Sequence, residues 1–167
     1  EMRASLADTL RGILFLALPA TVGLLLLREP VIGMLYQRGT FTAQSTAMVA
    51  WALAFYALGM VGHAVVEILS RAFYALHDTR TPVTVSVGAM GLTIALNFFF
   101  AYAFTRAGWL PHGGLALGLT VGTTLEGGVL LWLMRRRLQG LNLRRIWPGV
   151  WRAAAAAALM GLALAGW

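Results

Sequence analysis

Long stretches of apolar residues alternate with short polar segments along the whole chain. Five of these stretches are nearly free of charge: approximately residues 10–28, 46–70, 82–104, 113–134 and 152–167. As helices, the first four would rise about 28–38 Å and the last about 24 Å, against a hydrocarbon core of about 30 Å. The pattern predicts an all-α, polytopic membrane helix bundle with about five transmembrane helices.

The connections between these stretches are short and differ in character. Residues 30–36 are mostly apolar and predict a short helix lying in the membrane interface, followed by a turn at residues 38–40. Thr81 is expected to cap the third helix, with Pro82 at its first position. Residues 135–152 form a basic connector before the last stretch.

Composition supports a membrane protein and disfavours several soluble classes. Of the 167 residues, 59% are hydrophobic and 11% are charged, whereas soluble domains have about 45–50% apolar and about 25% charged residues. Soluble enzymes, nucleic-acid-binding domains and disordered tails are therefore disfavoured, and we expect membrane lipid rather than nucleic acid as the surroundings. The chain has no cysteine, which excludes disulfides and thiolate chemistry.

The distribution of arginine predicts the orientation of the helices. All 13 basic residues are arginine, and they fall mostly on one side of the predicted membrane. The N-terminal segment and the second and fourth connections carry Arg3, Arg11, Arg71, Arg80, Arg135, Arg136, Arg137, Arg144, Arg145 and Arg152. The opposite side carries only Arg28, Arg38 and Arg106. Because positive charge is concentrated in cytoplasmic loops, the arginine-rich side is expected to be cytoplasmic.

No catalytic constellation is present in the sequence. The chain contains no lysine for a phosphate-binding loop and no HExxH or GxSxG motif. Histidines and acids are too dispersed for a metal site. We therefore expect neither enzymatic activity, nor a metal, nor a cofactor.

Polar residues inside the second stretch are the strongest candidates for a functional role. His63, Glu67 and Arg71 are spaced four residues apart and share one face of the predicted helix. Ionisable residues within a membrane span usually face a bundle interior or a wet cavity, so these three are candidates for a substrate path. The competing interpretation is that Glu67 and Arg71 form an ion pair that merely anchors the helix end.

Two further polar residues lie inside predicted spans. Glu126 is about nine residues from the nearest following arginine, so its partner is expected on another helix or in a water-filled cavity, and it is a second candidate for the substrate path. Asn97 is expected to form an interhelical hydrogen bond or, less commonly, to bind an ion. Gly118 and Gly122 form a GxxxG pattern, which predicts close helix packing.

The sequence resembles the MurJ/MviN family of lipid II flippases, which are MATE-like transporters of the MOP superfamily. One matching stretch runs from Leu18-Pro19-Ala20 to Thr40-Phe41. The most specific block joins the end of the second helix to the start of the third, and its matching residues are Phe73, Tyr74, Asp78, Thr79, Thr81 and Pro82.

The resemblance implies a position within a larger transporter. The chain, residues 1–167, would be a partial C-terminal lobe covering about the ninth to thirteenth helices, with the N-terminal lobe of the same protein as its partner. The substrate would be lipid II, an undecaprenyl-diphosphate-linked disaccharide-peptide used in peptidoglycan biosynthesis and cell wall organization. It would cross the bacterial cytoplasmic (inner) membrane by alternating access of two lobes. Asn97 occupies the place of a sodium-binding asparagine in some members, but Ala101 stands where they have an acid.

Two alternatives stay open on the sequence alone. A flippase for polysaccharide repeats would move another polyprenyl-diphosphate-linked glycan. A membrane scaffold of cell-wall synthesis would transport nothing and would not need to keep Glu67 or Glu126.

The predicted orientation can be tested by labelling. A cysteine introduced at Gly140, in the basic connector, should react with a membrane-impermeant thiol reagent only from the cytoplasmic side, because the chain has no other cysteine. The measurement compares intact cells with inverted membrane vesicles. Labelling of intact cells would contradict the orientation.

Overall fold

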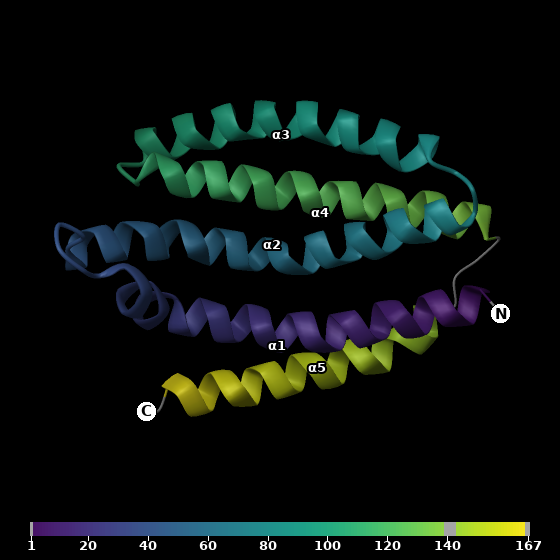
Figure 1. Ribbon diagram of the computed structural model, residues 1–167, viewed down its shortest axis with the longest axis horizontal. Helices are drawn as coiled ribbons and strands as arrows, with labels where there is room; N and C mark the ends of the chain where they lie inside the picture. The colour runs from purple at the N-terminus through teal and green to yellow at the C-terminus, as the bar shows by residue number, and fades with distance from the viewer. Residues whose placement is uncertain (1, 139–142, 166–167) are drawn as a thin grey trace.

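The protein is a row of antiparallel and parallel helices. The computed structural model describes residues 2–138 and 143–165, in which the regular structure is entirely helical. The helices are α1 (Met2–Tyr36), α2 (Ala43–Ala75), α3 (Arg80–Arg106), α4 (Pro111–Arg137) and α5 (Leu143–Ala165). They pack in the spatial order α3, α4, α2, α1, α5, so that α4 separates α3 from most of α2 (Figure 1). The predicted all-α bundle is confirmed.

Four of the helices have the length and composition of membrane spans. Among the described residues, α1, α2, α3 and α4 are long and apolar enough to cross a membrane. The fifth crossing, at residues 152–167, stays a prediction. Its helix begins at Leu143, inside the segment predicted to be a connector. Arginine is a good helix former, so the arginines of that segment are compatible with a helix.

The end of α1 differs from the sequence prediction. Residues 30–36 are not a separate helix; they are the last turns of α1, which continues through Pro19 and Pro30. Beside the second proline, the Arg28 guanidinium donates a hydrogen bond of 2.8 Å to the Leu25 carbonyl. The predicted turn at residues 38–40 is confirmed, and its Gly39 adopts a φ of +61° that favours glycine.

Close approach of α3 to α4 depends on glycines. Gly114, Gly118 and Gly122 are spaced four residues apart on α4 and are buried. A Cβ atom at Gly114 would lie 2.6 Å from the carbonyl oxygen of Phe100. A Cβ atom at Gly118 or Gly122 would overlap side chains of α3. The close packing predicted for the GxxxG pattern is confirmed.

The opposite side of α4 packs on α2 with equally small residues. A Cβ atom at Gly59 of α2 would lie 2.8 Å from the Thr120 hydroxyl oxygen of α4. That hydroxyl donates a hydrogen bond of 2.7 Å to the carbonyl oxygen of Phe55. Small residues and hydroxyl–carbonyl bonds are the usual means by which membrane helices associate, because lipid tails offer no hydrophobic drive.

An apolar core joins the start of α1 to the ends of α2 and α4, at the end of the bundle where the N-terminus lies (Figure 1). Its fully buried side chains include Leu69, Phe73, Leu130 and Met134. Leu6 and Leu10 of α1 complete the core. This core fixes the ends of α1 and α2 relative to each other, and the candidate functional site lies at its edge.

The glycine packing can be tested by substitution. Gly114→Ala should destabilise the full-length protein by about 1–3 kcal/mol, because the new methyl group would press on a backbone carbonyl that cannot move aside. Gly91→Ala is the matched control, since a Cβ atom there meets nothing within 4 Å. Thermal unfolding in detergent measures both variants. An equal loss of stability in both would contradict the packing role.

Candidate functional site

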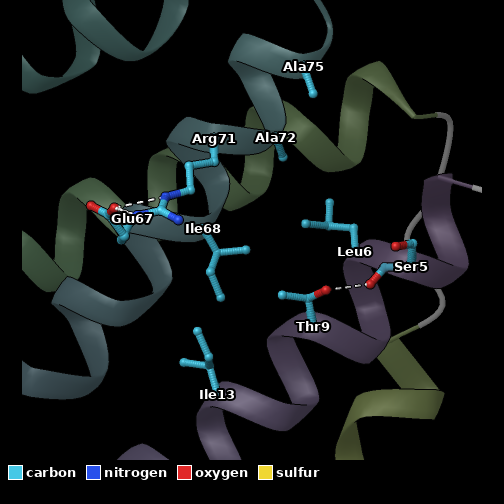
Figure 2. A pocket seen from close by; sticks show the side chains of 9 residues that line it. All are labelled: Ser5, Leu6, Thr9, Ile13, Glu67, Ile68, Arg71, Ala72 and Ala75. Carbon is cyan, nitrogen blue, oxygen red and sulfur yellow. Dashed lines mark hydrogen bonds and ion pairs between the residues drawn. The ribbon is translucent and has the colours of Figure 1, made fainter.

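A groove opens between the start of α1 and the end of α2, at the arginine-rich end of the bundle, where the N-terminus also lies. Its volume is approximately 530 Å³, and we call it the α1–α2 groove. Its walls are formed by Ser5, Leu6, Thr9, Ile13, Glu67, Ile68, Arg71, Ala72 and Ala75. Figure 2 shows the charged pair on the α2 wall, the two hydroxyl residues on the α1 wall, and isoleucine side chains between them. The groove therefore combines an apolar floor with a charged rim.

Glu67 and Arg71 form an ion pair on the rim of this groove. The Arg71 Nε and Nη2 atoms donate hydrogen bonds of 2.9 and 2.5 Å to the same Glu67 oxygen, Oε1. The side chains are 77% and 63% exposed for Arg71 and Glu67, respectively. An exposed i,i+4 pair contributes only about 0.3–0.5 kcal/mol to stability. Its main structural effect is to hold the guanidinium beside the groove.

His63 lies one turn further along the same face of α2 but outside the groove. Its Nδ1 atom is 3.1 Å from the Gly59 carbonyl oxygen of the preceding turn. His63 is exposed, as are Glu67 and Arg71. The structure thus keeps His63, Glu67 and Arg71 on one exposed stripe, as the spacing predicted.

Glu126 belongs to a different interface. It is half-buried, and its Oε1 atom accepts a hydrogen bond of 2.5 Å from the Ser86 hydroxyl of α3. It continues the line of Gly114, Gly118 and Gly122 along α4. The expectation of a partner on another helix is confirmed, but the structure does not bring Glu126 to the groove that contains Glu67 and Arg71.

Asn97 faces the same α3–α4 interface, where it packs against Gly118. Its Oδ1 atom is buried and accepts no hydrogen bond from any residue that the structure describes. The predicted interhelical hydrogen bond is therefore not formed within residues 2–138 and 143–165. In those ranges no group of three or more histidine and acidic side chains is arranged to hold a metal ion.

The block from Phe73 to Pro82, between α2 and α3, forms a tight structural joint. The Asp78 N–H donates to the Phe73 carbonyl at 3.0 Å and the His77 N–H to the Tyr74 carbonyl at 2.9 Å, with His77 at a φ of 57°. These two bonds are the Schellman pattern that terminates a helix. The aromatic ring of Phe73 is buried in the core, so the joint is fixed to the bundle.

Asp78 then begins the next helix. Its two carboxylate oxygens accept a bond of 3.0 Å from the Thr81 N–H and one of 2.8 Å from the Thr81 hydroxyl. Thr79 is the residue at the helix boundary and makes no capping bond, and Pro82 is buried within the first turn. The expectation that Thr81 caps the helix is wrong: Thr81 lies inside α3 and is itself capped, because only a residue before the first turn can reach its free N–H groups.

An ion pair ties the joint to the end of α4. Arg137 contacts the Asp78 carboxylate, whose side chain is only 14% exposed. The hydrogen bonds from the Thr81 N–H and hydroxyl, followed by the bond and charge of Arg137, hold the pKa of Asp78 below its ordinary value of 3.8. The block that carries the family resemblance is thus explained by folding, without a contact to the α1–α2 groove.

Sequence reasoning missed the α1 wall of the groove. Ser5 and Thr9 are four residues apart on α1, and the Thr9 hydroxyl donates to the Ser5 carbonyl at 2.9 Å. Their spacing indicated a polar stripe before the first span. Hydropathy and helical spacing do not report that this stripe lies opposite α2.

A family model matches the whole chain, and curated relatives match most of it. The model of the family described as lipid II flippase MurJ matches residues 1–167. The lipid II flippase MurJ of Burkholderia cenocepacia is 34% identical over 137 residues, covering 82% of this chain and 25% of that protein. The probable lipid II flippase MurJ of Vibrio cholerae is 32% identical over 160 residues, covering 93% of this chain and 28% of that protein.

A solved structure shares the fold. It is described as lipid II flippase MurJ in an inward closed conformation, and it superposes with a TM-score of 0.82 at 23% sequence identity. The match covers 98% of this chain and 33% of that one. The chain therefore spans about a quarter of the length of the curated relatives above.

The role of Asp78 can be tested by its dependence on pH. Because the folded-state pKa lies below 3.8, the carboxylate stabilises the fold above that pH and the contribution is lost as the pH falls through the lowered pKa. Asp78→Ala should lower the unfolding temperature of the full-length protein at pH 7, and the difference from wild type should shrink below about pH 4. Thr79→Ala, which removes no capping bond, should leave the unfolding temperature unchanged. A pH-independent effect of Asp78→Ala would contradict the assignment.

Proposed function

Because the chain belongs to the MurJ lipid II flippase family, we propose that it forms part of a flippase that moves lipid-linked peptidoglycan precursor across the bacterial cytoplasmic membrane. The substrate is lipid II and the mechanism is alternating access, in which the helices described here rock against the remaining lobe of the protein. Such a transporter forms and breaks no covalent bond.

The observation that carries this proposal is the exposed charged pair on the rim of a groove whose floor is apolar. Glu67 and Arg71 lie at the groove within a helix that is apolar enough to span a membrane. A charge facing lipid at the centre of a membrane costs about 2.5–3.5 kcal/mol on insertion scales, and less toward the interface. A water-filled path or the other lobe of the protein, placed against this face, removes much of that cost.

The chemistry of the groove matches a lipid-linked diphosphate. The Arg71 guanidinium presents several donors to phosphate oxygens, and such charge-assisted contacts are among the strongest polar interactions in proteins. Glu67 positions that guanidinium through the hydrogen bonds to its Nε and Nη2 atoms. Ile13 and Ile68 offer apolar surface beside the charged rim. In this proposal Arg71 receives the anionic head group as it enters from the cytoplasmic side.

His63 and Glu126 take different parts in this proposal. His63 extends the polar stripe of α2 one turn deeper than Glu67, along the path of the head group. Glu126 is bonded to Ser86 between α3 and α4, so its contribution is to the packing of the lobe that moves, at a distance from the groove.

The proposal predicts a difference between two arginines. In the full-length gene, Arg71→Ala should impair rescue of a flippase-depleted strain, with lipid II translocation reduced about tenfold or more, because loss of a charge-assisted contact costs about 1.5–3 kcal/mol. Arg106→Ala is the control. Arg106 is the last residue of α3, at the other end of the bundle from the groove, and its guanidinium donates a hydrogen bond of 3.0 Å to the Tyr102 hydroxyl. Rescue and translocation are compared at matched expression.

The outcomes separate the proposal from its alternatives. Equal tolerance of both substitutions would leave the ion pair as an anchor of α2 and remove Arg71 from the substrate path. Failure of the wild-type gene to rescue, together with rescue of a strain deficient in polysaccharide-repeat export, would assign a different polyprenyl-linked glycan as the substrate.

A further inference from the structure

A second cavity lies between α1 and α5, on a different face of α1 from the α1–α2 groove. The two helices run side by side in the same direction (Figure 1). The cavity has a volume of approximately 380 Å³ and is lined by Asp8, Arg11, Gly12, Phe15, Gly149 and Arg152. It takes no part in the transport path proposed above.

The position of Arg11 depends on the glycine opposite. Gly149 of α5 is buried, and a Cβ atom there would lie 2.5 Å from Cγ and 2.7 Å from Nε of Arg11. Only a residue without a side chain allows the arginine to lie across α5 in this way. The cavity is therefore shaped by a specific contact between the Arg11 side chain and the α5 backbone at Gly149.

Two guanidinium groups line this one cavity. Arg11 and Arg152 come from neighbouring helices, and with Asp8 they give the described part of the lining a net charge of +1. Like charges that share a cavity repel each other, and a bound anion relieves this repulsion. Basic pockets between helices on the cytoplasmic side of a membrane are typical sites for anionic lipid head groups.

The order of charge and apolar surface along α1 specifies the kind of anion. Phe15 lies one turn deeper than Arg11, lines the same cavity and is 48% exposed. Leu16 beside it is 70% exposed. A ligand that fits must carry its negative charge at one end and apolar chains below it.

The depth of the cavity matches the head-group region. Trp151 precedes Arg152 on α5 and is 71% exposed. Exposed tryptophans gather at membrane–water interfaces. Arg152 and Arg11 also lie at the arginine-rich end of the bundle, so the cavity is at the level of the leaflet on the predicted cytoplasmic side.

We infer that this cavity binds the phosphodiester head group of an anionic phospholipid, with the phosphate between Arg11 and Arg152 and the acyl chains descending past Phe15. A phospholipid whose head group carries one net negative charge complements the net charge of the lining. Zwitterionic lipids do not provide this complement.

Lipid binding to the full-length protein tests the inference. Purified protein is transferred to nanodiscs of phosphatidylcholine with increasing phosphatidylglycerol, and bound lipid is counted by native mass spectrometry after release. Arg11→Gln and Arg152→Gln should each weaken phosphatidylglycerol binding about fivefold. The double variant Arg38→Gln, Arg106→Gln removes two charges from the opposite side, one more than either test variant, and should bind normally.

A further variant separates a built site from diffuse attraction. Gly149→Ala keeps every charge but displaces the Arg11 side chain, so it should weaken phosphatidylglycerol binding as Arg11→Gln does. Normal binding by Gly149→Ala, or equal occupancy by phosphatidylethanolamine, would overturn the inference. Soluble glycerol phosphate should not displace the lipid, because it lacks the acyl chains that contact Phe15; displacement would assign the site to a free phosphate instead. Unfolding temperatures in phosphatidylcholine alone show that each variant is folded.

Discussion

The close approach of α4 to its two neighbours is the constraint on which the rest of the bundle depends. Within the most apolar 18 residues of α4, 44% of the residues are buried, whereas none is buried in the corresponding stretch of α3. Lipid tails are as apolar as leucine, so burial alone does not bring membrane helices together. Glycines at residues 114, 118 and 122 instead allow direct contact with the α3 backbone and side chains. The order of the helices, and with it the separation of the polar sites, follows from this contact.

The polar residues divide between interfaces because α4 lies between α3 and α2. Glu126 and Asn97 are enclosed between α3 and α4, where Ser86 bonds to the carboxylate and Gly118 packs against the amide. Glu67 and Arg71 lie on the far side of α2, facing α1. A chain with few charged residues thus uses them in distinct roles: some stabilise helix contacts, and others remain exposed at grooves where a ligand can reach them.

The arginine-rich end of the bundle contains both a structural ion pair and candidate binding sites. The Asp78–Arg137 pair joins the α2–α3 connection to α4, while Arg71 and Arg11 border separate cavities. In the two proposals above, the arginines from which the cytoplasmic orientation is predicted are also the groups that would bind phosphate: Arg71 in the α1–α2 groove and Arg11 in the cavity between α1 and α5.

The sequence by itself determined the helical class, the presence of four long apolar helices, the shared face of Glu67 and Arg71, and the close packing of Gly118 and Gly122. These features depend on hydropathy and on the helical repeat, which are local. Three features came only from the structure: the continuity of α1 through Pro30, the capping of α3 by Asp78, and the assignment of Glu126 to the α3–α4 interface. The first two are local, but hydropathy does not report which residue begins or ends a helix. The third depends on which helices are neighbours in space, and that order is set by contacts between residues far apart in the chain.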